Sequence, residues 1–303
     1  MSAHTPAEDV VLRSRPKVTV LDLQEKRDRG EPIAMLTAYD CPTARAIDAA
    51  GVDAILVGDS LAMVVLGHPN TLSVSMEEML HHARAVSRGA RSVLLIGDMP
   101  FLSYQADVAE AVRNAGRFLK DAGMDAVKLE GGCEFVPTVR AIVRAGIPVQ
   151  GHIGLMPQSM HRQGGFKVQG RTAEGARSLL EDALALQDAG CFSIVIEGVP
   201  ARLGAFITER LRIPTLGIGA GGGTSGQVLV VNDILGLGDR VPRFAKRYAD
   251  LGAVIGEAVA SYRRDVKERA FPAPEHGYDL PDEEWRAFLA SVGTNLRAVP
   301  VAR

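Results

Sequence analysis

Two similar stretches decide the fold of this 303-residue chain: DAILVGDSLAM at residues 53–63 and SVLLIGDMPF at residues 92–101. Each contains four consecutive apolar residues, which is typical of a strand buried on both faces in a parallel sheet. Each run is then followed by a Gly-Asp pair, with the acid at Asp59 in the first stretch and at Asp98 in the second. The repetition raises the question of why two buried strands should both end on an acid.

The same pattern, an apolar segment followed by an amphipathic stretch, recurs along the chain. Eight segments have strand length and are rich in Val, Ile and Leu: residues 33–40, 54–60, 92–98, 125–132, 147–154, 192–198, 213–221 and 227–236. Strands that alternate with helices form a parallel sheet, and eight such units predict an α/β fold of the (βα)8 TIM barrel type. The last two segments are separated only by GGTSG, which leaves no room for a helix. A doubly wound sheet is the alternative, but LTAYDCPTA after the first segment is not the nucleotide loop that such a sheet usually carries.

The chain is expected to have three parts. Residues 1–16 are polar and predict a loose N-terminal arm, residues 17–270 form the barrel, and residues 271–303 form a C-terminal tail packed on it. The long helical segment after the eighth strand would close the barrel, and Trp285 would hold the tail down. Ser75 is a predicted helix N-cap.

Composition excludes several classes of function. A net charge of −2 and a pI of about 6.4 give no electrostatic argument for a nucleic-acid or membrane partner. No apolar run approaches the ~18 residues of a transmembrane helix, and the start of the chain lacks the apolar core of a signal peptide. The three cysteines form no C-x-x-C pair, which argues against a zinc site or a disulfide framework. We therefore expect a cytoplasmic protein.

The candidate site follows from the barrel, whose active sites lie at the C-terminal ends of the strands. The polar residues at these ends are Asp59, Ser60, Asp98, Lys128, Glu130, His152 and Glu197. Four are acids, and a divalent cation would offset their mutual repulsion. Oxygen ligands without cysteine favour a hard ion such as Mg²⁺. The alternative is that Asp59 and Asp98 only cap the helices that follow. The glycine before each acid would let the backbone turn or approach a ligand closely.

Two further candidates have roles of their own. Lys128 and Glu130 are two residues apart on one strand, so both face the barrel interior. Lys128 could bind a carboxylate or form a Schiff base, and the alternative is an internal ion pair with Glu130. An acid in apolar surroundings takes up a proton more readily than one in water, so Glu197 is a candidate general base. Its alternative role is again a helix cap.

Two glycine-rich loops lie between strands. The long loop at residues 151–172 could close over a substrate, form an oligomer contact, or do both. The stretch GIGAGGGTSG at residues 217–226 contains G-x-G-x-x-G, but no clear helix follows it and no acid lies about twenty residues on. We interpret it as backbone that approaches a ligand closely, not as a dinucleotide site.

These motifs together resemble the ketopantoate hydroxymethyltransferase (3-methyl-2-oxobutanoate hydroxymethyltransferase) family over roughly residues 17–278. The resemblance rests on MLTAYD, VGDSLAMVVLGHPNTLSV, GDMPF, VKLEGG, GHIGLMPQS, GGFKVQG, DALALQDAG, IEGVP and GIGAGGGTSGQVLV, in this order. It implies a barrel of the phosphoenolpyruvate/pyruvate superfamily and a Mg²⁺-dependent, aldol-type transfer in pantothenate biosynthesis. The hydroxymethyl group would pass from 5,10-methylenetetrahydrofolate to 3-methyl-2-oxobutanoate (α-ketoisovalerate), giving ketopantoate. It also implies a homodecamer.

The resemblance assigns roles to the candidate residues one by one. Asp59 in VGDS, Asp98 in GDMP and Glu130 in KLEGG match the metal-binding acids. Glu197 in IEGVP matches the proton acceptor. The matches to substrate-binding residues are Asp59, Ser60, Asp98, Lys128 and His152.

Some positions depart from the family pattern, and other activities stay open. Ser225 in GAGGGTSGQ stands where the family usually has an acid, which leaves the folate or loop contacts near it open. One alternative is another Mg²⁺-dependent oxoacid aldolase or lyase of the same superfamily. Others are a Schiff-base aldolase using Lys128 and a protein that only binds the ketoacid.

Overall fold

The computed structural model describes residues 15–238 and 241–293. The chain divides into two compact units, Met1–Ala249 and Asp250–Arg303. In the first unit eight parallel strands form a closed barrel in chain order, which confirms the predicted (βα)8 fold. The strands are β1 (Ile33–Thr37), β2 (Ala54–Val57), β3 (Leu94–Asp98), β4 (Ala126–Glu130), β5 (Val149–Gly154), β6 (Ser193–Glu197), β7 (Thr215–Ile218) and β8 (Gly226–Leu229).

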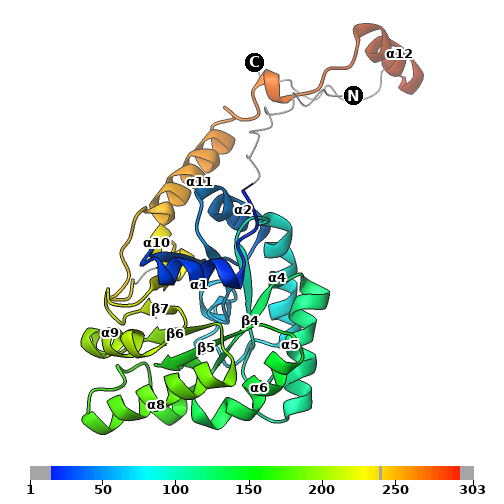
Figure 1. Ribbon diagram of the computed structural model, residues 1–303. Helices are drawn as coiled ribbons and strands as arrows, with labels where there is room; N and C mark the ends of the chain where they lie inside the picture. Colours follow the sequence, from blue (N-terminus) through cyan, green and yellow to red (C-terminus); the bar gives the residue numbers. More distant parts are fainter. Residues whose placement is uncertain (1–14, 239–240, 294–303) are drawn as a thin grey trace. The chain divides into compact units, whose positions relative to one another are not determined.

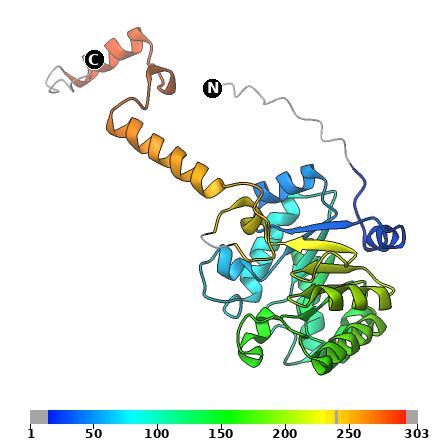
Figure 2. The same ribbon diagram turned by 90° about the vertical axis from the view of Figure 1, so that its left-hand side faces the viewer.

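Helices lie outside the strands of this barrel (Figure 1, Figure 2). They are α1 (Val20–Asp28), α2 (Cys41–Ala50), α3 (Leu61–Val64), α4 (Met76–Gly89), α5 (Val108–Ala122), α6 (Val136–Arg144), α7 (Met160–Gln163), α8 (Ala173–Ala189), α9 (Ala201–Arg210) and α10 (Val231–Leu235). Ser75 caps α4 through a capping box with Glu78, as predicted. No described helix is long and apolar enough to cross a membrane.

The apolar core has two layers. One lies between the sheet and the surrounding helices, and the other fills the barrel interior with side chains such as Met35, Leu56 and Ile96. Leu23 of α1 belongs to the interior layer. In α1, Gln24 Nε2 donates to the carbonyl of Arg212, 2.9 Å away and just ahead of β7. Helix α1 therefore closes the amino-terminal end of the barrel and leaves the carboxyl-terminal end for a site.

The glycine of the second Gly-Asp pair has a packing role that the sequence did not indicate. A Cβ on Gly97 would lie 2.3 Å from the ring of Phe118 in α5. Strand β3 therefore needs glycine there so that α5 can pack against it. A ligand contact or a sharp turn is not the reason for this glycine, which lies within the strand. Gly58, in contrast, borders the cavity described below.

The end of the barrel differs from the prediction in the length of the eighth strand. Only the first part of the predicted strand is extended, and the short helix α10 follows it. The sheet closes by pairing of β8 with β1, from Gly226 opposite Ile33 onward. The role of the long helix in closing the barrel stays a prediction.

That helix, α11 (Leu251–Lys267), belongs to the second unit together with α12 (Asp282–Val292). The division between the units falls earlier than the predicted barrel end at residue 270. In α12, Trp285 stacks on Phe288 with ring centroids 5.4 Å apart. The packing of the tail on the barrel stays a prediction. The first fourteen residues of the predicted arm and residues 294–303 of the tail lie outside the described residues.

Candidate active site at the carboxyl end of the barrel

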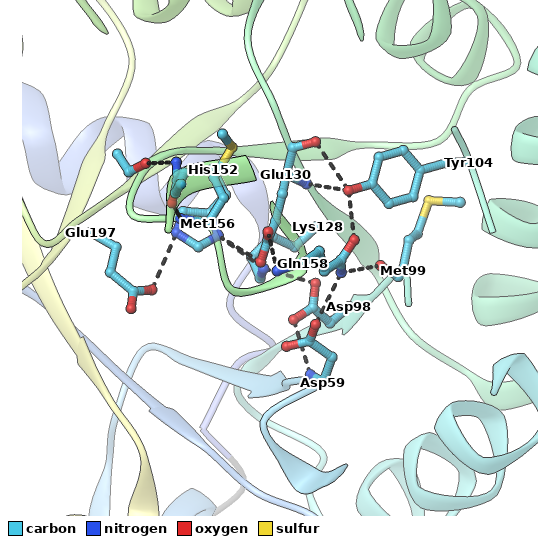
Figure 3. Close-up of polar contacts among 12 residues, drawn as sticks. Asp59, Asp98, Met99, Tyr104, Lys128, Glu130, His152, Met156, Gln158 and Glu197 are labelled. Atoms are coloured by element: carbon cyan, nitrogen blue, oxygen red, sulfur yellow. Dashed lines mark hydrogen bonds and ion pairs between the residues drawn. The ribbon is translucent and has the colours of Figure 1, made fainter. Parts of the chain in front are cut away.

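A cavity of about 1060 Å³ opens at the carboxyl-terminal ends of the strands. All seven residues predicted for the site line it: Asp59, Ser60, Asp98, Lys128, Glu130, His152 and Glu197. Figure 3 shows how most of them converge. The register of the parallel strands produces this convergence, because it places Asp98 beside Lys128 and Glu130 beside His152.

The two acids of the opening stretches are joined directly. The backbone N–H of Asp59 donates to Asp98 Oδ2 at 3.0 Å, and Asp98 Oδ1 lies 2.8 Å from Lys128 Nζ (Figure 3). The helix-cap alternative is wrong for both acids. The N-cap of α3 is Ser60, which makes no side-chain capping bond, and α5 is capped by Asp107.

Burial and the closeness of like charges shift the pKa values of the side chains in this cluster. Burial, followed by repulsion from Asp98 and Glu130, raises the pKa of Asp59 well above its usual value. Burial also raises the pKa of Asp98, although Lys128 opposes the rise. Burial alone would lower the pKa of Lys128, but the three acids outweigh it and the net shift is upward. A lysine held in its charged form is a poor amine nucleophile, which argues against the Schiff-base alternative.

His152 joins the two remaining acids. Its Nδ1 lies 3.5 Å from Glu130 Oε1, and its Nε2 lies 3.2 Å from Glu197 Oε2 (Figure 3). Burial and the charge of Lys128 lower the pKa of His152, but the contacts with Glu130 and Glu197 outweigh them and raise it to about 9. Glu197 therefore faces a histidine and does not act as a helix cap, since α9 begins after Pro200.

Ser60 lies at the edge of the same cluster. It is half-buried, and its Oγ is 2.9 Å from the hydroxyl of Tyr39. A hydroxyl held this way can still turn one hydrogen-bonding position toward a ligand in the cavity.

The sequence patterns did not predict two buried residues of the site, Gln158 and Tyr104. Gln158 Nε2 donates to Asp59 Oδ2 at 3.0 Å, and the backbone N–H of Gln158 donates to Glu130 Oε2 at 3.0 Å. The hydroxyl of Tyr104 bonds Gln158 Oε1 at 2.8 Å and accepts the N–H of Glu130 at 3.1 Å. The MPQS stretch contains Gln158, but its loop has no strand or helix periodicity from which burial could be predicted.

Both glycine-rich loops border the cavity. Phe166 and Val168 of the long loop line it, as do Gly219 and Gly221 of the GIGAGGG stretch. Ser225 lies elsewhere, because it precedes β8 at the amino-terminal end of the barrel. There its backbone N–H donates to Thr215 Oγ1 at 3.1 Å. The departure at Ser225 therefore concerns this far end and not the lining of the cavity.

The donor atoms of the acids suit a hard divalent cation. Asp59, Asp98 and Glu130 offer only oxygen donors, and three buried carboxylates share one lysine. Among the described residues, Glu130 Oε1 is buried without a hydrogen-bond partner. Nevertheless, within residues 15–238 and 241–293 no three His, Cys, Asp or Glu side chains stand close enough together to hold a metal ion as they are placed. The magnesium site therefore stays a prediction.

Comparisons with solved structures support the fold. A phosphonopyruvate hydrolase matches with a TM-score of 0.58 at 14% identity, covering 91% of this chain and 98% of that one. 2,3-Dimethylmalate lyase, a member of the PEP mutase/isocitrate lyase superfamily, matches with a TM-score of 0.53 at 19% identity, covering 90% and 99%. At these identities the likeness shows the fold alone.

Comparisons with sequences show the family. A 3-methyl-2-oxobutanoate hydroxymethyltransferase of Chloroflexus aggregans is 57% identical over 277 residues, covering 91% of this chain and 99% of the relative. One from Nitratidesulfovibrio vulgaris is 53% identical over 297 residues, covering 96% of both. The model of the ketopantoate hydroxymethyltransferase family matches residues 17–274. This chain therefore belongs to the ketopantoate hydroxymethyltransferase family, and it is an enzyme that transfers a hydroxymethyl group.

Proposed function

We propose that this chain transfers a hydroxymethyl group from 5,10-methylenetetrahydrofolate to 3-methyl-2-oxobutanoate and so makes ketopantoate for pantothenate biosynthesis. The observation that carries the proposal is the buried group of Asp59, Asp98 and Glu130 around Lys128, beside the His152–Glu197 contact. Relatives named for this reaction, at 53–57% identity, support the choice of ketoacid.

The ketoacid would bind through its carboxylate and its keto oxygen. Lys128 stays charged among the acids, so it can neutralise the substrate carboxylate, and the hydroxyl of Ser60 can donate a hydrogen bond to it. Asp59, Asp98 and Glu130 would hold Mg²⁺. The cation would polarise the keto group and stabilise the negative charge that develops on its oxygen.

Glu197 would accept the proton from C3 of the ketoacid. Its side chain is 15% exposed at the cavity wall, and His152 lies 3.2 Å from Oε2. This contact holds one carboxylate oxygen and leaves the other for the substrate. Water would supply the hydroxyl oxygen: it releases the methylene carbon from both folate nitrogens as formaldehyde and leaves tetrahydrofolate. The carbanion would then add to this carbon, and the oxygen would take up the proton that Glu197 removed. A cavity of about 1060 Å³ can hold both substrates.

The test is to assay ketopantoate from 3-methyl-2-oxobutanoate and 5,10-methylenetetrahydrofolate, with Mg²⁺ or with EDTA. We expect product with Mg²⁺ and its loss in EDTA. No product with both substrates and Mg²⁺ would overturn the proposed reaction, and an unchanged rate in EDTA would remove the metal from it. The homodecamer is part of the proposal, and light scattering on the full chain tests it.

A further inference from the structure

The buried side chain of Gln158 links the long loop to the acids of the site. Gln158 lies in η2 (Pro157–Ser159), after β5, and is 6% exposed. Its side-chain amide contacts Asp59, and its backbone N–H contacts Glu130, each at 3.0 Å (Figure 3). One residue outside the strands therefore binds acids from two different strand ends.

The orientation of the Gln158 amide is fixed by its surroundings. Nε2 also donates to the carbonyl of Met99 at 2.9 Å, and a carbonyl can only accept. Oε1 faces the hydroxyl of Tyr104 at 2.8 Å and Gln105 Nε2 at 3.1 Å. Both N–H groups and the oxygen of the amide are thus used. A buried network that is satisfied in this way is rigid, because any rotation would leave a polar group unpaired.

The consequence for the acids is that each has one oxygen occupied by a neutral donor. Gln158 holds Oδ2 of Asp59 and Oε2 of Glu130. Glu130 Oε1 makes no hydrogen bond among the described residues and has His152 Nδ1 near it, at 3.5 Å. Neutral donors restrain a carboxylate without cancelling its charge, so the remaining oxygen keeps its affinity for a cation. Lys128, which pairs with Asp98, restrains its acid by cancelling charge.

We propose that Gln158 is a positioning residue, which holds Asp59 and Glu130 with one oxygen each available to the divalent cation and ties residues 154–172 to the acid cluster. The inference rests on the proposed metal site and deepens it. Gln158 is not assigned a contact with substrate or with reacting atoms. It acts through the two carboxylates.

Gln163 provides a matched control in the same loop. Its Nε2 donates to the carbonyl of Gly154 at 2.9 Å, and its Oε1 accepts from the N–H of Met156 at 3.1 Å. It therefore closes the base of the loop through two amide hydrogen bonds, but it contacts no acid of the site. A role that merely maintains the loop would make Gln158 and Gln163 equally important for cation binding.

The experiment measures Mn²⁺ binding to the full-length, metal-stripped protein by the electron paramagnetic resonance signal of free Mn²⁺, without substrates. Gln158→Met and Gln163→Met keep side-chain length and remove the amide. We expect Gln158→Met to weaken Mn²⁺ binding about 10- to 100-fold, as loss of a residue that orients metal ligands does. We expect Gln163→Met to leave it nearly unchanged.

Two results would overturn the inference while leaving the metal site in place. One is wild-type Mn²⁺ affinity in Gln158→Met, and the other is equal weakening in both variants. Failure of the wild-type protein to bind Mn²⁺ would instead remove the metal site and the role of Gln158 with it. If Gln158→Met does not fold, Tyr104→Phe replaces it in the test. This change removes the hydroxyl bonded to Gln158 and Glu130 and should weaken Mn²⁺ binding several-fold, and wild-type affinity there would also overturn the inference.

Discussion

Acids lie at both ends of this barrel, but their surroundings differ. At the amino-terminal end, Asp53 accepts the N–H of Ala34 at 2.8 Å and lies 3.2 Å from Lys26. Asp125 likewise accepts the N–H of Leu95 at 2.8 Å, and it lies 2.7 Å from Lys17. Each acid that precedes a strand there has its own backbone donor and a lysine beside it, although Lys26 also pairs with Glu31. At the carboxyl-terminal end three buried acids share Lys128 and His152.

The difference separates structural acids from functional ones. Asp53 and Asp125 are paired and link neighbouring strands, so their charges require nothing further. The acids after the strands have fewer cations than charges, and burial together with repulsion from Asp98 and Glu130 raises the pKa of Asp59. Such an imbalance costs stability and is retained where a ligand can use the charge. Four substitutions test this contrast, and the largest effects are expected at the carboxyl-terminal end.

The largest expected effect is on proton transfer at Glu197. Glu197→Gln removes the proposed proton acceptor but keeps the size of the side chain facing His152. Loss of a general base lowers a rate by about 10²- to 10⁴-fold. We expect a decrease of this size in the exchange of the C3 proton of 3-methyl-2-oxobutanoate in deuterated water. Exchange at the wild-type rate would exclude Glu197 from the role.

The second expected effect is on stability when the shared lysine is lost. Lys128→Met leaves Asp98 buried without its 2.8 Å partner. Breaking a buried pair in this way costs about 3–5 kcal/mol. The cost should shrink as the pH falls, because Asp98 can then take up a proton and lose its unpaired charge. Urea unfolding of the metal-free protein at two pH values measures this, and a cost that does not depend on pH would contradict the account.

The third expected effect is a pH dependence of stability from His152. Its pKa is raised to about 9 in the folded chain, so its protonation favours the fold. This contribution is complete below the unfolded pKa of about 6.5 and is lost as the pH rises through about 9. In EDTA, the unfolding free energy of the wild-type protein should therefore fall by up to about 3 kcal/mol more over this window than that of His152→Gln. Parallel curves for the two proteins would show that His152 does not gain its proton affinity from the fold.

The contrast between the two ends also explains what could be predicted from the sequence. Strand ends can be recognised from apolar runs, and a parallel barrel brings all such ends together, so all seven polar candidates were found to line one cavity. The partner of Lys128 could not be predicted. Spacing within a strand shows which face a residue occupies, whereas the register between strands decides that Asp98 is its neighbour.

Features that depend on distant parts of the chain were missed for the same reason. Gln158 and Tyr104 come from segments between strands, and only tertiary packing buries them. Gly97 is required by the ring of Phe118 in a helix that follows later in the chain. The helical pattern of α11 was visible in the sequence, but the register at which β8 pairs with β1 was not.

The smallest expected effect comes from the same substitution at the other end of the barrel. Lys17→Met removes the 2.7 Å partner of Asp125, but both side chains are about one-third exposed, at 38% and 33%. Solvent screens such a pair, and Asp125 keeps the backbone N–H of Leu95, so the cost should be about 0.2–1 kcal/mol. Urea unfolding beside Lys128→Met measures it, and Mn²⁺ binding should not change. If Lys17→Met lowered the unfolding free energy as much as Lys128→Met, the availability of a lysine partner would not distinguish the acids at the two ends. Burial alone would then have to explain why the acids at the carboxyl-terminal end have perturbed pKa values.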